Sequence, residues 1–142
     1  MAKFVYRMQN ILNIKQKLET QAKMTYSLAH QKYLEQQKIL QEYMVRRVGY
    51  EQHWKKLMQG NLNLQEVEHA RADVNAMKTI VRRQMVEVHK AEKELEDARN
   101  RLKTVMQERK VQEKLREKAF EEFKQELAEA ETKEIDELVS YT

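Results

Sequence analysis

The sequence contains no cysteine and no proline, and it has only two glycines in 142 residues. Without cysteine the chain has neither disulfides nor thiolate metal sites. A sheet needs turn-forming residues between its strands, and a chain with so little glycine and proline does not supply them. These absences argue against an all-β or α/β domain and favour long helices.

Long uncharged apolar runs are also missing. No stretch approaches the roughly 18 apolar residues that a membrane span requires. Residues 1–24 lack the continuous apolar centre of a secretory signal. We therefore expect a cytoplasmic protein.

Apolar and charged residues are instead interleaved along the whole chain, as in long helices and coiled coils. The one plausible break is at residues 58–63, where Gly60 can close a helix and Asn63, three residues before Glu66, can cap the next. We predict an all-α fold, a long antiparallel two-helix coiled-coil hairpin that forms a single unit over residues 1–142. Its first helix should cover about 3–58, its turn about 59–63 and its second helix about 64–138.

The second half carries a coiled-coil seam. Its apolar residues recur at alternating spacings of three and four over more than five heptads, which is a strong coiled-coil signal. The seam positions are Val67, Ala70, Val74, Met77, Val81, Val88, Ala91, Leu95, Ala98, Leu102 and Val105, with the polar Gln84 as the exception before Arg109.

The first half carries a second seam, which changes phase near its beginning. Its positions are Ala22, Tyr26, Ala29, Tyr33, Gln36, Leu40, Tyr43, Arg47, Tyr50, Trp54 and Leu57. The earlier apolar residues are out of phase with it by one residue: Phe4, Met8, Ile11 and Leu18. Two successive steps of four, from Leu18 to Ala22 and on to Tyr26, form a stutter, so we expect the supercoil to loosen there.

Folding the chain back at Leu62 places large residues of one seam opposite small residues of the other. Tyr26 then faces Ala98, and Tyr33 faces Ala91. Close packing favours this complementarity, which predicts an intramolecular antiparallel hairpin rather than a parallel dimer. The charges agree, because residues 1–60 hold 11 Lys and Arg against 4 Asp and Glu, whereas residues 61–142 hold 16 against 19.

Catalytic and metal-binding signatures are absent from the sequence. The four histidines do not each have a carboxylate beside them at metal-ligand spacing: His30, His53, His69 and His89. The sequence has no glycine-rich phosphate loop, no nucleophile elbow and no His-Glu-x-x-His helix. We therefore predict no catalytic, cofactor or metal site and no small-molecule substrate, and we reject an enzyme.

Basic pairs and aromatic residues of the sequence suggest two kinds of binding partner, nucleic acid and protein. The basic pairs Arg46-Arg47, Lys55-Lys56 and Arg82-Arg83 could meet phosphates. In the second half, however, Lys and Arg alternate with Glu, which is the ordinary pattern of a solvated coiled-coil face and argues against nucleic acid. The tyrosines and the tryptophan of the first seam could instead form a protein docking surface.

The two ends of the chain resemble the FliJ family of flagellar type III export proteins. The resemblance lies in the opening Phe4–Leu12 and in the closing stretches Glu113–Lys118 and Lys133–Leu138. It implies a non-catalytic protein similar to the central stalk of rotary ATPases. Such a protein sits with the hexameric export ATPase and promotes its ring assembly, links it to the export gate membrane protein, and binds export chaperones. It would serve flagellar motility and chemotaxis, as a cytoplasmic protein peripherally associated with the membrane at the flagellar base.

The resemblance also implies two contact surfaces. The gate-binding surface of the family has a Gln-x3-Leu-x2-Tyr-x3-Tyr spacing, which Gln36, Leu40 and Tyr43 fit, although Arg47 replaces the last aromatic residue. The residues expected to face it are Val74, Met77 and Val81. We place the ATPase-ring contact at the end formed by the two termini, where the second helix outruns the first and the apolar residues are out of phase: Phe4, Ile11, Leu12, Phe120 and Phe123.

Two other functions stay open. One is a generic coiled-coil adaptor in a virulence-type secretion system, which a gene neighbourhood without flagellar ATPase genes would favour. The other is a nucleic-acid-binding helical hairpin, which a steep salt dependence of DNA binding would favour.

Overall fold

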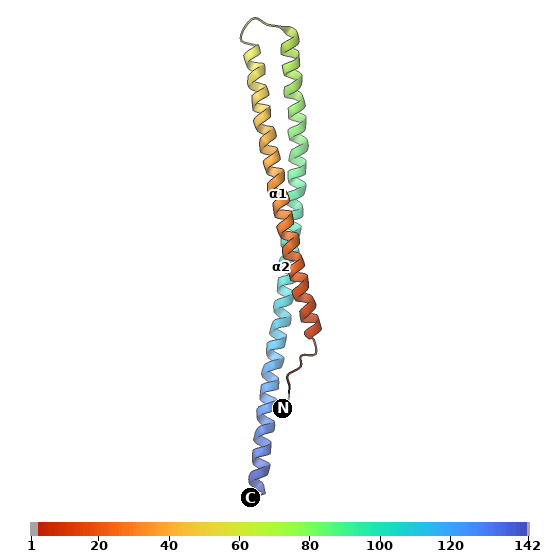
Figure 1. The fold of residues 1–142 in the computed structure, drawn as a ribbon, viewed down its shortest axis with the longest axis vertical. Coiled ribbons are helices and arrows are strands. Elements are labelled where there is room, and N and C mark those ends of the chain that lie inside the picture. The colour runs from red at the N-terminus through yellow and green to blue at the C-terminus, as the bar shows by residue number, and fades with distance from the viewer. Residues whose placement is uncertain (1–2, 142) are drawn as a thin grey trace. The chain divides into compact units, whose positions relative to one another are not determined.

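The computed structural model describes residues 3–141, which form two helices, α1 (Gln9–Leu57) and α2 (Leu64–Ser140). In Figure 1, α1 runs from red to yellow and α2 from green to blue. The prediction of an all-α helical hairpin is confirmed. The chain divides into two compact units, which we call the terminal unit (Met1–Lys23 with Asn100–Thr142) and the turn unit (Met24–Arg99).

The first helix begins later than the sequence predicts. Helix α1 starts at Gln9, and residues 3–8 are not helical. The backbone N–H of Gln9 donates to the carbonyl of Tyr6 at 3.1 Å, which closes a turn just before the helix. The ring of Phe4 instead packs against the rings of Phe120 and Phe123 of α2. These aromatic contacts hold the segment before Gln9 against α2.

The turn between the helices is capped largely as predicted. Helix α1 ends at Leu57, with Lys55 and Lys56 in its last turn, where a positive charge interacts favourably with the helix dipole. The side-chain oxygen of Asn63 accepts a hydrogen bond from the backbone N–H of Gln65 at 3.1 Å, which is an N-cap for α2. Gly60 does not adopt the left-handed conformation of a glycine C-cap, because no glycine of the described residues has a positive φ.

The turn unit is held together by an apolar seam. Its buried α2 residues are the ones that the heptad pattern predicts: Ala70, Val74, Met77, Val81, Gln84, Ala91, Leu95 and Ala98. The tyrosines, leucines and tryptophan of the α1 seam are half-buried, except for Tyr50, which is 40% exposed. Small α2 residues are thus fully covered while large α1 residues keep one edge at the surface. Small buried residues on one helix packed against larger, half-buried residues on the other are what the large-to-small pairing leads us to expect.

Polar groups cross the same seam at two places in the turn unit. The Gln84 side-chain amide donates to the Gln36 backbone carbonyl at 2.9 Å and to the Gln36 side-chain oxygen at 2.8 Å. Lys32 and Glu94 form an exposed ion pair at 3.1 Å. Both contacts join α1 to α2, so they fix which residues of the two helices lie opposite each other.

The terminal unit has a more polar interface. Its buried residues are Leu12, Glu19, Ala22 and Val105. Glu19 pairs with Arg109, and Lys15 pairs with Glu108 at 2.8 Å. Ionic contacts therefore occupy positions that apolar side chains occupy in the turn unit.

The predicted change of phase near the start of α1 is wrong. The buried positions Leu12, Glu19 and Ala22 continue the phase of Tyr26, whereas Ile11 is 39% exposed. Burial along α1 therefore shows no stutter at Leu18. The apolar pattern was misleading because Arg109 of α2 draws a charged residue, Glu19, into the seam.

Candidate partner-binding surfaces

The first candidate surface is the aromatic cluster of the terminal unit. The ring centroid of Phe4 lies 5.0 Å from that of Phe120, edge to face, and 5.5 Å from that of Phe123. The Arg116 guanidinium lies 5.5 Å from the Phe4 ring, and the Lys124 ammonium lies 4.7 Å from the Phe120 ring. Aromatic pairs and cation–π contacts of this kind order the side chains. Phe120 nevertheless stays about one third exposed, so the cluster offers a partner an apolar surface.

The two remaining residues predicted for the ATPase-ring contact, Ile11 and Leu12, differ in their exposure to solvent. Leu12 is only 3% exposed and belongs to the core of the terminal unit, so a partner does not reach it in this conformation. Ile11, its neighbour, is exposed. Of the five predicted residues, Phe4, Phe120 and Phe123 form one cluster, Ile11 is accessible and Leu12 is not.

The last turns of α2 extend the exposed apolar surface. Leu127, Ile135 and Leu138 are all exposed, and the side chains between them are mostly acidic. Residues 119–142 hold eight Asp and Glu against two Lys. This part of α2 is an amphipathic helix with an acidic surround.

The ion pairs of the terminal unit change the acidity of their members. Burial would raise the pKa of Glu19, but hydrogen bonds and attraction from Arg109, with a contribution from Lys23, outweigh it and lower this pKa. A hydrogen bond from Lys15 lowers the pKa of Glu108. Hydrogen bonds to Glu113 and Glu19 raise the pKa of Arg109, which is therefore charged at any physiological pH.

The second candidate surface is the predicted gate stripe of the turn unit. Gln36, Leu40 and Tyr43 lie on α1 and are half-buried. The α2 residues predicted to face them are in the core, with exposures between 1% and 7%: Val74, Met77 and Val81. A partner does not touch these three residues while the helices stay together.

Sequence reasoning missed the α2 side of this stripe. A surface hollow is lined by Tyr43, Ile80, Arg83, Gln84, Val86 and Glu87. Ile80 and Arg83 each immediately precede a seam residue, so the signal was adjacency to Val81 and Gln84. The Arg46 guanidinium lies 5.9 Å from the Tyr43 ring on the α1 side. Arg47, at the position of the missing aromatic residue, pairs with Glu51 at 3.1 Å.

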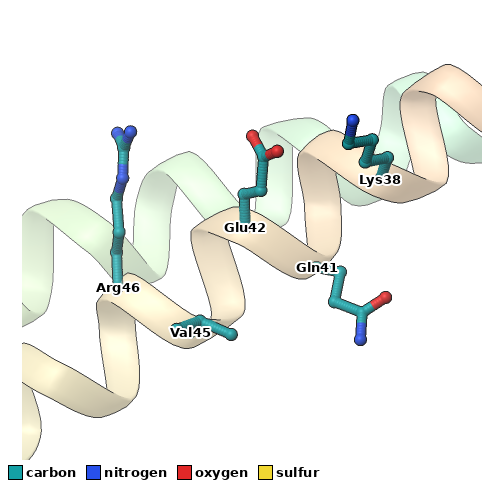
Figure 2. A pocket seen from close by; sticks show the side chains of 5 residues that line it. All are labelled: Lys38, Gln41, Glu42, Val45 and Arg46. Carbon is teal, nitrogen blue, oxygen red and sulfur yellow. The ribbon is translucent and has the colours of Figure 1, made fainter.

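A shallow hollow follows the outer face of α1. Figure 2 shows Lys38, Glu42 and Arg46 extending to one side of it and Gln41 and Val45 to the other. Lys38, Glu42 and Arg46 are spaced four residues apart, so their charges alternate along one face of the helix. The hollow lies on the surface of one helix, and it does not enclose a small molecule.

Neither a metal-binding cluster nor a membrane-spanning helix is found in the described residues 3–141. No group of three or more His, Asp or Glu residues in this part of the chain is arranged to hold a metal ion. His53 and His69, which folding back at the turn should bring together, line two different hollows. No helix in the described range is long and apolar enough to cross a membrane.

Comparison with known proteins gives one match. A family described as "Flagellar FliJ protein" matches residues 4–142, which is nearly the whole chain. The comparisons with curated proteins and with solved structures gave no match.

Proposed function

Because the chain belongs to the FliJ family, whose members are non-enzymatic components of flagellar export, we propose that it couples the export ATPase to the export gate. In this proposal it promotes assembly of the hexameric ATPase ring and links the ring to the gate membrane protein. The observation that carries the proposal is the family match over residues 4–142. Two separate exposed surfaces, one in each unit, support it.

The ring contact is assigned to the terminal unit. Phe4, Phe120 and Phe123 form a partly exposed aromatic cluster there, and Ile11 adds an exposed apolar side chain. Leu12, which was assigned to the same contact, lies in the core of the terminal unit. Burying large apolar side chains of this kind against a ring contributes about 1.5–3 kcal/mol each, which is enough to favour assembly.

The gate contact is assigned to the turn unit. Gln36, Leu40 and Tyr43 contribute the α1 side, and the hollow beside Tyr43 adds Ile80 and Arg83 from α2. Val74, Met77 and Val81, which the proposal assigns to the same contact, lie in the core of the turn unit. A half-buried tyrosine with an arginine over its ring is a common anchor in protein interfaces.

The proposal extends to location and to further partners. The protein would act in the cytoplasm, peripherally associated with the membrane at the flagellar base through its gate contact. Export chaperones are a third partner class, which the family membership supports. No contact of the described residues distinguishes a chaperone surface from the two surfaces above.

The ring assignment is tested by ATP hydrolysis measured against the concentration of the export ATPase. A chain truncated after Ala119 lacks Phe120, Phe123 and the acidic end of α2, and it should no longer stimulate assembly-dependent hydrolysis. The substitution pair Phe120→Ala and Phe123→Ala should weaken stimulation by roughly tenfold or more. Undiminished stimulation by the truncated chain would place the ring contact elsewhere.

The gate assignment is tested separately. Changing Leu40 and Tyr43 to Ala should weaken binding to the gate protein and leave ATPase stimulation largely intact. Val45→Ala is the matched control, because Val45 is an exposed residue of the same helix outside the stripe. Equal loss of gate binding and ATPase stimulation, with helix content unchanged by circular dichroism, would contradict the assignment to two surfaces.

A further inference from the structure

The first turns of α1 bury a different face from the one that their apolar residues define. Ile11, Ile14 and Leu18 recur at spacings of three and four, which is the pattern of an apolar helix face. In the structure Ile11 is 39% exposed and Ile14 is 55% exposed, whereas Leu18 is half-buried. The interface with α2 instead contains Leu12, Lys15 and Glu19, each one residue further along the chain.

Ionic contacts maintain this arrangement. Lys15 contacts Glu108 at 2.8 Å, and Glu19 contacts Arg109, which also contacts Glu113 at 2.8 Å. The pair Glu19 and Arg109 is largely shielded from water. A shielded ion pair recovers little more than the cost of removing both charges from water. The observed packing therefore has only a small advantage over one that buries the apolar face.

The two faces are related by a simple motion. Consecutive residues of an α-helix are about 100° apart around its axis, so a rotation of that size exchanges Leu12, Lys15 and Glu19 for Ile11, Ile14 and Leu18. Seams that repeat every seven and every eleven residues require about 3.5 and 3.67 residues per turn. An undistorted helix has about 3.6, between these values. Because α1 is continuous from Gln9 to Leu57, the exchange is a gradual rewinding of the helix over these residues, and not a rigid rotation of the segment.

We propose that residues 9–22 of α1 have two packings against α2 within the terminal unit, and that the ion pair of Glu19 and Arg109 selects the observed one. The second packing buries Ile11, Ile14 and Leu18 and exposes Leu12, Lys15 and Glu19. The segment is thus a two-state element whose surface changes between apolar and charged. The inference concerns the chain alone and does not depend on the proposed partners.

The test removes the selecting charge and reads the exposure of single cysteines. Arg109→Leu removes the cross-helix partner of Glu19 and leaves it only the ion pair with Lys23 of its own helix at 3.5 Å, which should drive the segment into the second packing. The chain has no cysteine of its own, so Leu12→Cys, Ile14→Cys and Thr20→Cys can each be labelled alone. Thr20 is exposed and belongs to neither face, so Thr20→Cys reports general loosening. The readout is the rate of reaction with a maleimide in the full chain.

With Arg109→Leu, labelling at Ile14→Cys should slow by roughly tenfold and labelling at Leu12→Cys should accelerate by roughly tenfold, while Thr20→Cys is unchanged. Adding Ile11→Gln and Leu18→Gln removes the apolar gain of the second packing, so Ile14→Cys should become fast again. Unchanged rates at positions 12 and 14 would show a single packing and overturn the proposal. Acceleration at position 12 without protection at position 14 would show detachment of the segment, which also overturns it. Circular dichroism confirms that each variant keeps its helices.

Discussion

Ala91 provides a direct test of the packing in the turn unit. It is 1% exposed, and the sequence pairs it with the large Tyr33 of α1. Ala91→Trp introduces a bulky ring where the structure leaves no free surface. Neighbouring side chains must then leave their preferred rotamers or the helices must move apart, so the free energy of unfolding should fall by about 1–3 kcal/mol.

The assay is urea unfolding followed by far-ultraviolet circular dichroism. The adjacent residue Glu92 is exposed, so Glu92→Trp adds the same ring at nearly the same position along α2 without crowding the seam. This control should change the free energy of unfolding by less than about 0.5 kcal/mol. If Ala91→Trp costs no more than Glu92→Trp, the seam is not closely packed at Ala91 and the reasoning fails.

A second step asks which α1 residue the new ring meets. Tyr33→Ala should remove the clash, so the double variant should be more stable than the two single changes predict, by more than about 0.5 kcal/mol. Tyr26→Ala, one heptad away, should give no such coupling. Equal coupling from both tyrosine variants would refute the pairing of Ala91 with Tyr33.

Three further predictions concern single contacts. Because the pKa of Glu19 is lowered in the folded chain, its contribution to stability is full above the ordinary glutamate range and is lost as pH falls through that range and below it; unfolding midpoints measured from pH 7 downward should therefore fall less steeply in Glu19→Gln than in the unmodified chain. Gln84→Leu replaces a hydrogen-bonded amide in the seam by an apolar side chain of similar size, and urea unfolding should show a change below about 1 kcal/mol. Phe4→Ala removes two aromatic contacts and should destabilise the terminal unit by about 1 kcal/mol in thermal unfolding, whereas Lys3→Ala should have no effect.

Periodicity predicted the α2 seam well. Every heptad position from Val67 to Val105 is buried or half-buried in the structure, including the polar Gln84. The pattern succeeds there because apolar residues recur over many turns with Gln84 as the one polar exception, and helix geometry then leaves one choice of face. Tyr50 is the exception in α1, since it keeps 40% of its surface exposed beside the half-buried Glu51.

The same method failed where charge decides. At the start of α1 the apolar residues define one face, but Glu19 is drawn into the seam by Arg109, which lies 90 residues away along the chain. A pattern of apolar residues in one helix carries no information on such a distant partner. The presence of Arg109 at a seam position was the available signal, because a charge there needs an opposite charge to meet it.

The candidate surfaces were predicted in part for a related reason. Folding the chain back at the turn brings the two ends together, so the sequence correctly grouped Phe4 with Phe120 and Phe123. It does not show which members of a face are covered. Leu12 and Val74 were assigned to partner surfaces, although both lie in the core.

The hydrogen bonds between Gln84 and Gln36 have a consequence for how the helices align. If α1 slid by one heptad in the turn unit, the buried amide of Gln84 would lie opposite Ala29 or Tyr43 instead of Gln36. It would then lose the Gln36 side-chain acceptor at 2.8 Å, whereas the backbone carbonyl that accepts at 2.9 Å has an equivalent at every helix position. The loss of one such hydrogen bond costs about 0.5–1.5 kcal/mol. Apolar seam residues tolerate such a slip far better, because one apolar neighbour can replace another. The Gln84–Gln36 pair therefore favours the observed alignment of the two helices over one that is shifted by a heptad.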